Sequence, residues 1–170
     1  MQALCKESGY AAVREALMTP PVKPGHMELA LAQARLAADR GEVPVGAVLV
    51  SPEGQVVAAA GNKTRELSDP TAHAEILVIR QACRIVGSER LVNYDLYVSL
   101  EPCPMCAAAI SFARIRRLYY GAADPKSGGV EQGARIFSQP TCHHVPEIYP
   151  GLAEDEAGAI LKSFFASRRS

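Results

Sequence analysis

The chain has 170 residues, a length that suits one domain with a substantial hydrophobic core. Hydrophobic residues make up 48% and charged residues 21%, the balance of an ordinary globular protein, and the formal net charge is zero. The overall charge therefore does not indicate a nucleic-acid binder, and a polyanionic partner would have to bind a local basic patch.

Residues 1–24 read as a separate piece of the chain. They contain no long apolar core followed by a small-residue cleavage site, so they do not predict a signal peptide. Residues 11–18 can form a short helix, which the prolines between residues 20 and 24 end in a semi-rigid linker. We expect a disordered N-terminal extension over residues 1–24 and one domain over residues 25–170.

The domain is expected to begin with a helix and a hairpin. Apolar residues recur at helical spacing over residues 27–38, and Gly41 follows where a C-terminal cap belongs. Residues 45–50 form a continuous apolar run typical of a buried strand. Residues 56–60 are its expected hairpin partner, across a turn over residues 51–55.

Strands and helices alternate in the rest of the chain. After a loop over residues 62–70, we expect a helix from about Thr71 to Gly87, an alternating strand over 95–100 and a helix with Pro104 at its first position. A strand over 117–121, a short edge strand over 145–149 and a helix from Leu152 to Arg169 follow. Acidic residues in the first turn of the last helix, with Arg168 and Arg169 in its last turn, would complement the helix dipole. This order predicts a mixed sheet with helices on both faces.

Two short stretches carry candidate chemistry, TAHAEI at residues 71–76 and EPCPMC at residues 101–106. Together they supply one histidine, two cysteines and a carboxylate that is not needed as a ligand. Thiolate sulfur and imidazole nitrogen are preferred zinc ligands, and three protein ligands leave one coordination position for water. Zinc lowers the pKa of that water from about 15.7 towards about 7. The two stretches therefore predict a hydrolytic zinc site.

The predicted ligands are His73, Cys103 and Cys106, which lie at the starts of two expected helices. Residues three apart share a helix face, so the two cysteines can hold one ion. Helix N-termini also favour thiolate over thiol. Glu75 can carry protons without binding the metal. We predict one zinc ion per chain, with Glu75 as the catalytic carboxylate.

A fourth protein ligand would make the site structural instead. Cys83 is ten residues after His73 on the same helix, about 15 Å away at the α-helical rise, which excludes it. The Cys-His-His run at residues 142–144 is not excluded by spacing, because a loop can bring it back. A closed site would leave Glu75 without a task, which favours the open site.

Aromatic and basic side chains gather at the C-terminus. Phe164 and Phe165 point about 100° apart on a helix, so one of them is expected at the surface. An exposed phenylalanine beside Arg168 and Arg169 would form a stacking platform with cations, which suits single-stranded RNA. The alternative is that both rings are core and the arginines form a solvated helix end.

Cysteine usage bears on the compartment. The chain has five cysteines, an odd number, and two of them form a Cys-x-x-Cys pattern. This favours metal binding in a reducing cytosol over a disulfide framework. No apolar run approaches the roughly 18 residues that a membrane span needs. We therefore expect a cytoplasmic protein without a membrane segment.

His-x-Glu followed by Pro-Cys-x-x-Cys resembles the signature of the zinc deaminases. Other stretches are similar to bacterial tRNA adenosine deaminases specifically. They are GEVPVGAV at residues 41–48, GN at 61–62, DPT at 69–71, LYVSLE at 96–101, RIRR at 114–117, DPKSGG at 124–129, FF at 164–165 and RR at 168–169. The resemblance covers residues 27–169.

This resemblance implies a three-layer α/β/α cytidine-deaminase-like fold with a central five-stranded mixed sheet, usually in a homodimer. The implied reaction is hydrolytic conversion of the wobble adenosine of a tRNA anticodon to inosine, with tRNA-Arg as the expected tRNA. In that reaction Glu75 would shuttle a proton from water to the adenine ring and then to the departing amine. Asn62 would contact the flipped nucleoside, and Asp124 and Lys126 would lie near the anticodon stem-loop.

Two alternatives stay open. Pro104 within CPMC resembles guanine deaminases, which also share the stretch DPTAHAE, so free guanine is an alternative substrate. The RIRR segment and the basic, aromatic C-terminus favour the tRNA enzyme. The other alternative is a catalytically silent, zinc-stabilised RNA-binding subunit, and the presence of Glu75 counts against it.

Overall fold

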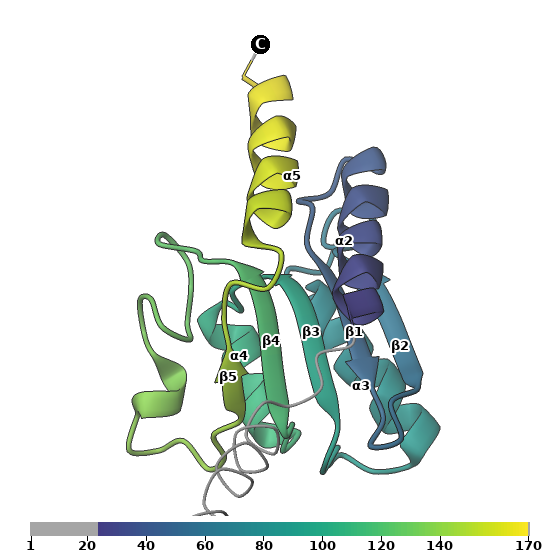
Figure 1. Ribbon diagram of the computed structural model, residues 1–170, viewed down its shortest axis with the longest axis vertical. Helices are drawn as coiled ribbons and strands as arrows, with labels where there is room; N and C mark the ends of the chain where they lie inside the picture. Colours follow the sequence, from purple (N-terminus) through teal and green to yellow (C-terminus); the bar gives the residue numbers. More distant parts are fainter. Residues whose placement is uncertain (1–23, 170) are drawn as a thin grey trace, which may run out of the picture.

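A computed structural model describes residues 24–169, and a five-stranded mixed sheet forms its centre (Figure 1). The strands are β1 (Gly46–Val50), β2 (Val56–Gly61), β3 (Asp95–Leu100), β4 (Arg117–Ala122) and β5 (Glu147–Tyr149). Their order is β2-β1-β3-β4-β5, with β1 antiparallel to both neighbours and β3, β4 and β5 parallel to one another. The predicted hairpin and edge strand are confirmed. The predicted N-terminal extension, apart from residue 24, lies outside the described residues.

Helices cover both faces of this sheet. They are α2 (Pro24–Asp39), α3 (Ala74–Val86), α4 (Pro104–Phe112) and α5 (Glu154–Ser167), with a short 3-10 helix η1 (Ile136–Ser138). α2 and α5 lie on one face, and α3 and α4 lie on the other (Figure 1). The predicted three-layer α/β/α fold is therefore confirmed. No helix within residues 24–169 is long and apolar enough to cross a membrane.

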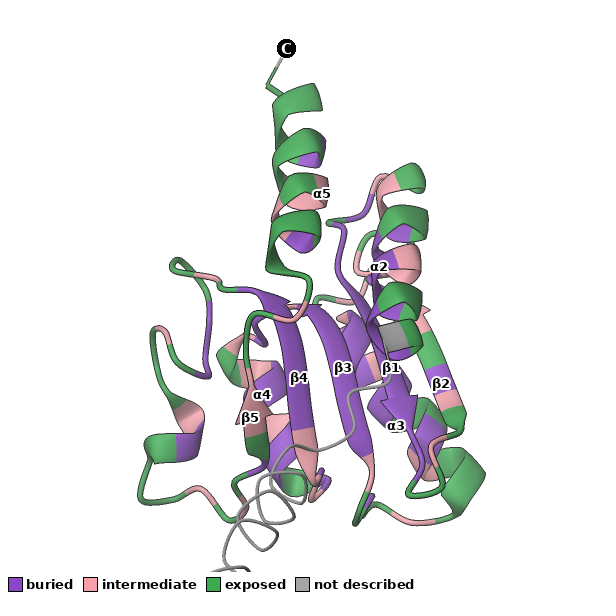
Figure 2. Ribbon diagram, in the orientation of Figure 1, coloured by how far each residue is buried: buried purple, intermediate pink, exposed green. Residues whose placement is uncertain are grey.

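Two apolar layers hold the sheet between its helices. Leu31 of α2 packs with Val48 on one face, whereas Ile110 of α4 packs with Leu96 and Leu118 on the other. Burying each such side chain contributes about 1.5–3 kcal/mol relative to exposing it. The strand predicted over residues 95–100 is confirmed as β3; because both of its faces are covered, all but its last residue are buried (Figure 2).

The observed helix ends differ from the prediction in two places. α3 begins at Ala74 instead of Thr71, because the Asp69 carboxylate accepts hydrogen bonds from the Thr71 N–H and hydroxyl and holds a turn there. α5 ends at Ser167 with no basic residue in its last turn, so the prediction for the terminal arginines is wrong. The guanidinium of Arg168 instead donates to the carbonyl of Gly41 and lies over the Phe164 ring.

Candidate active site

The starts of α3 and α4 bring the predicted ligands together. His73 and Cys103 are the N-cap residues of these two helices, and both have extended backbone conformations. Pro104 occupies the first helical turn, where its missing N–H costs nothing, as predicted. Cys106 follows in that turn and is buried. Two helix N-termini, each with partial positive charge, therefore meet at this cluster.

The three donor atoms have the spacing of ligands around one zinc ion. His73 Nδ1 lies 3.6 Å from Cys103 Sγ and 3.5 Å from Cys106 Sγ, and the three atoms all lie within 4.8 Å of one another. A tetrahedral zinc with bonds of about 2.0–2.1 Å to nitrogen and 2.3 Å to sulfur would separate these ligands by about 3.6 Å. The residues present therefore fit a zinc ion, with one coordination position open to a small ligand.

The local electrostatics favour a thiolate in this cluster. Hydrogen bonds from the Cys106 thiol, and then from His73, lower the pKa of Cys103 to about 4. Cys106 shares the same hydrogen bond, which together with burial raises its own pKa. Zinc binds the thiolate form of cysteine, so the lowered pKa of Cys103 favours metal binding.

Glu75 is a buried carboxylate beside the ligands. It lies in the first turn of α3, only 3% exposed, and its Oε2 atom has no hydrogen-bond partner within the described residues. Burial raises the pKa of Glu75 to about 7, and the nearby Cys103 charge acts in the same direction. A buried carboxylate oxygen without a partner is costly and rare. Its position beside a metal cluster suits a group that accepts and returns a proton near neutral pH.

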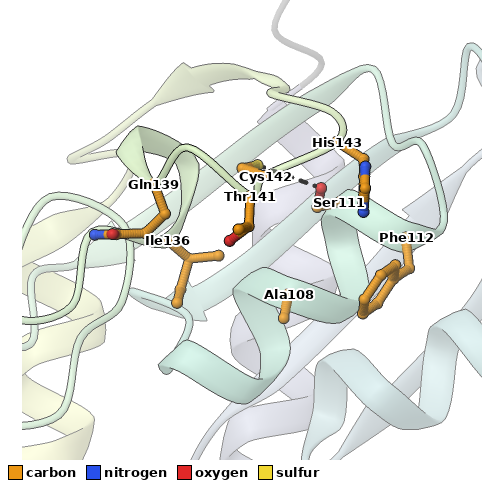
Figure 3. A pocket seen from close by; sticks show the side chains of 8 residues that line it. All are labelled: Ala108, Ser111, Phe112, Ile136, Gln139, Thr141, Cys142 and His143. Carbon is orange, nitrogen blue, oxygen red and sulfur yellow. Dashed lines mark hydrogen bonds between the residues drawn. The ribbon is translucent and has the colours of Figure 1, made fainter.

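The other cysteines and histidines do not join the cluster. Cys83 packs against the core on α3. Cys142 Sγ lies 3.4 Å from the Ser111 hydroxyl, in a cavity of about 180 Å³ next to α4 (Figure 3). His144 Nε2 lies 2.6 Å from the Ile115 carbonyl oxygen. Among the described residues, the group able to hold a metal contains only the three predicted ligands, so the Cys-His-His run gives no support to a closed, structural site.

Asn62 is held against the first turn of α3. It follows β2 and is 6% exposed, and its Oδ1 accepts a hydrogen bond from the Ala74 N–H at 2.8 Å. Ala74 lies between the predicted ligand His73 and the predicted catalytic Glu75. The hydrogen bond therefore fixes the orientation of the Asn62 amide relative to both residues.

Asp124 and Lys126 lie outside the metal cluster, in a groove beside the C-terminal helix. We call this the α5 groove; its volume is about 640 Å³. It is lined by Val43, Leu100, Ala123, Asp124, Lys126, Ser127, Leu161, Phe165, Arg168 and Arg169. Phe165 is 46% exposed here, whereas Phe164 is buried, so the prediction that one of the two rings lies at the surface is confirmed. The groove thus joins cations to an exposed aromatic ring.

Two buried carboxylates, Glu42 and Glu101, have roles that the sequence did not predict. Glu101 accepts hydrogen bonds from four backbone N–H groups of residues 124–132. Glu42 accepts from the Thr64 hydroxyl and from the N–H groups of residues 65 and 66. One signal in the sequence pointed to Glu101: it is an acidic residue directly after an apolar strand and before a proline. Its partners are more than 20 residues away, so the sequence could not supply them.

A family profile for the cytidine and deoxycytidylate deaminase zinc-binding region matches residues 23–122. The tRNA-specific adenosine deaminase of Agrobacterium fabrum is 67% identical over 143 residues, which cover 84% of this chain and 93% of that protein. The chain belongs to this deaminase family, among the tRNA-specific adenosine deaminases.

Solved structures of related deaminases have the same fold. One comes from studies of A-to-I editing by tRNA:A34 deaminases at the wobble position of transfer RNA. It is 67% identical, with a TM-score of 0.80 over 82% of this chain and 100% of that chain. A guanine deaminase from Bacillus subtilis is 31% identical, with a TM-score of 0.60 over 87% of this chain and 94% of that chain. The similarity is thus far greater to the tRNA-editing deaminase than to the guanine deaminase.

Proposed function

We propose that this deaminase hydrolyses the wobble adenosine of a tRNA anticodon to inosine and releases ammonia. The observation that carries this proposal is the unpartnered carboxylate oxygen of Glu75 beside a His-Cys-Cys cluster with zinc geometry. The 67% identity to a tRNA-specific adenosine deaminase supports adenosine in tRNA as the substrate. Among tRNAs, tRNA-Arg is the substrate that the resemblance favours.

The chain's own residues account for the proton transfers. His73, Cys103 and Cys106 would hold zinc, which supplies a Lewis acid that activates a water molecule. Glu75 Oε2 takes a proton from the attacking water and delivers it to N1 of the adenine ring, while the water oxygen bonds to C6. The same carboxylate then takes the second proton from the new hydroxyl on C6 and delivers it to the C6 amine. The C–N bond breaks, so that ammonia leaves and the carbonyl of inosine forms. Burial keeps bulk water from competing for that proton.

Recognition of the substrate falls to Asn62 and the α5 groove. The Asn62 Oδ1 atom is engaged by the Ala74 N–H, so its amide NH₂ is the group available to a bound nucleoside. Lys126 and Arg168 give the groove positive charge for phosphates, and Phe165 gives it a ring on which an unstacked base can lie. Bases of an anticodon loop are already unpaired, which lowers the cost of extruding the adenosine.

The alternatives have weaker support. Free guanine as the substrate rests on Pro104 and on the 31% identity to a guanine deaminase, but a free base has no phosphate for the cations of the α5 groove. A silent RNA-binding subunit would have no use for the buried carboxylate of Glu75.

A substrate comparison tests the proposed function. The zinc-loaded protein is incubated with an anticodon stem-loop carrying adenosine at the wobble position, with free guanine and with free cytidine, and ammonia release is measured. We expect ammonia, and inosine in the RNA, only with the stem-loop. Release from guanine alone would identify a guanine deaminase, and release from none of the three would support the silent subunit.

We also infer that the protein acts in the cytoplasm as a homodimer. The four cysteines within residues 24–169 are free thiols, as a reducing compartment requires. Phe112, Ile85 and Val92 each expose more than half of their surface, and apolar side chains left in water commonly mark an interface. Light scattering should give twice the chain mass. A monomeric mass at micromolar concentration would contradict the homodimer.

A further inference from the structure

Residues 123–132 form a loop that joins the α5 groove to the metal-ligand turn; we call it the clamp loop. At one end, Asp124, Lys126 and Ser127 line the groove. At the other end, the Gly129 N–H donates to the Pro102 carbonyl at 2.8 Å. A Cβ added to Gly129 would lie 2.5 Å from the Pro104 nitrogen. The loop therefore packs directly on the backbone that carries Cys103.

Glu101 holds this loop at both of its ends. Its Oε2 accepts from the Asp124 N–H at 3.0 Å. Its Oε1 accepts from three successive N–H groups, those of Val130, Glu131 and Gln132, at 2.9–3.2 Å. Successive backbone N–H groups around one anion form a nest, and hydrogen bonds to a charged acceptor are stronger than those between neutral groups. One carboxylate thus ties two parts of the clamp loop to the end of β3.

A chain of hydrogen bonds leads from Glu101 to the groove. The Asp124 carboxylate is already engaged within the loop: its Oδ1 accepts hydrogen bonds from the Lys126 N–H at 3.1 Å and from the Ser127 N–H at 3.0 Å. Glu101 fixes the backbone of Asp124, and Asp124 in turn fixes the backbone that carries Lys126. Glu101 itself is only 2% exposed, so it cannot touch an RNA.

We propose that Glu101 is a positioning residue for RNA: its buried carboxylate clamps residues 123–132 and thereby sets the place of Lys126 in the α5 groove relative to the metal centre. This inference rests on the proposed function, since it assigns the groove to RNA. It also gives Asp124 a structural role within the loop that the resemblance places near the RNA.

The substitution Glu101→Gln tests the clamp at one point. Glutamine has the shape of glutamate but only one acceptor oxygen, which we expect to face the three N–H groups of the nest. Its NH₂ group then faces the Asp124 N–H, donor against donor, and only that link breaks. Hydrogen exchange should accelerate about tenfold at the amides of residues 124, 126 and 127, and less at residues 130–132.

The functional readout is the affinity for RNA. The Kd of Glu101→Gln for an anticodon stem-loop with adenosine at the wobble position should rise about tenfold, with the loss of activity falling on KM more than on kcat. Zinc content should stay at one per chain.

Gly128→Ala provides a second approach, because the added Cβ would lie 2.7 Å from the Glu101 carboxyl carbon and push the loop away without removing the charge. It should give the same pattern.

Glu42→Gln is the matched control, since Glu42 is an equally buried carboxylate that holds a different loop. It should accelerate exchange at residues 65 and 66 and leave residues 124–127 protected. The proposal is overturned if exchange and Kd stay at wild-type values in both clamp variants. It is also overturned if both variants lose zinc, which would make Glu101 a general structural residue. Hydrogen exchange measured on the protein without RNA tests whether Glu101 holds the clamp loop, even if the wild-type protein fails to deaminate the stem-loop.

Discussion

The metal centre and the α5 groove differ in how the fold positions their side chains. The metal ligands lie at the first turns of two helices that pack on one face of the sheet, and each is fixed by the helix it begins. The groove is assembled from the clamp loop, a residue before β1, the last residue of β3, and α5 with the two arginines that follow it. The first arrangement gives rigid geometry for chemistry. The groove presents exposed groups to a large substrate, and its loop is held in place by the buried carboxylate of Glu101.

Removing a metal ligand should separate the two regions most completely. We expect Cys103→Ala to reduce zinc from one per chain to near zero and to abolish deamination, because metal binding here needs all three donors. Metal analysis and ammonia release measure the two effects. Cys83→Ala is the control, since this thiol lies on α3 away from the cluster and should leave zinc in place. Zinc retained at wild-type content in Cys103→Ala would remove this cysteine from the ligand set.

Glu75→Gln should break the chemistry while leaving both the metal and the groove intact. Glutamine fills the same space but cannot accept and return a proton, so kcat should fall by about 10²–10⁴-fold. Zinc content and the Kd for the stem-loop should change little. Glu89→Gln, at a highly exposed carboxylate, is the control for loss of one negative charge. Wild-type turnover by Glu75→Gln would exclude this carboxylate as the proton carrier.

Neutralising the groove should have the reverse effect. Lys126→Ala or Arg168→Ala should weaken stem-loop binding about tenfold and lower the slope of log affinity against log salt by about 0.7 for each lost phosphate contact with single-stranded RNA. Binding titrations between low and moderate salt measure this. Arg84→Ala removes a charge from α3 on the opposite face and should change neither quantity. An unchanged salt slope in both groove variants would place the RNA elsewhere.

The two adjacent phenylalanines should give the smallest effect on deamination and the clearest contrast. Phe165→Ala removes an exposed ring, so it should weaken RNA binding by about 1 kcal/mol, or about fivefold, and leave thermal stability unchanged. Phe164→Ala instead opens a cavity beneath Arg168 and should lower the free energy of unfolding by about 3–5 kcal/mol. Thermal melts and stem-loop titrations distinguish the two. Equal losses of stability would show that Phe165 is also core.

The same contrast explains what the sequence could predict. His73, Cys103 and Cys106 are predicted from local motifs, and the start of α4 follows from its proline. The start of α3 was predicted three residues too early, because the turn held by Asp69 was not foreseen. The burial of β1 was predictable from its continuous apolar run, but the burial of β3 on both faces was not, because it depends on helices distant in the chain. The hydrogen bonds accepted by Glu101 could not be predicted for the same reason. Its four donors come from a loop whose return to the end of β3 is a property of the fold.

The close packing of Gly128 and Gly129 restricts how this enzyme can be redesigned. An added Cβ at Gly128 would collide with the Glu101 carboxylate, and one at Gly129 would collide with the backbone of Cys103 and Pro104. A mutant library that seeks new substrates should therefore keep both glycines and randomise only residues 125–127. Such a library would vary the surface that we propose for RNA while preserving metal loading, and folded, zinc-containing variants should be frequent in it.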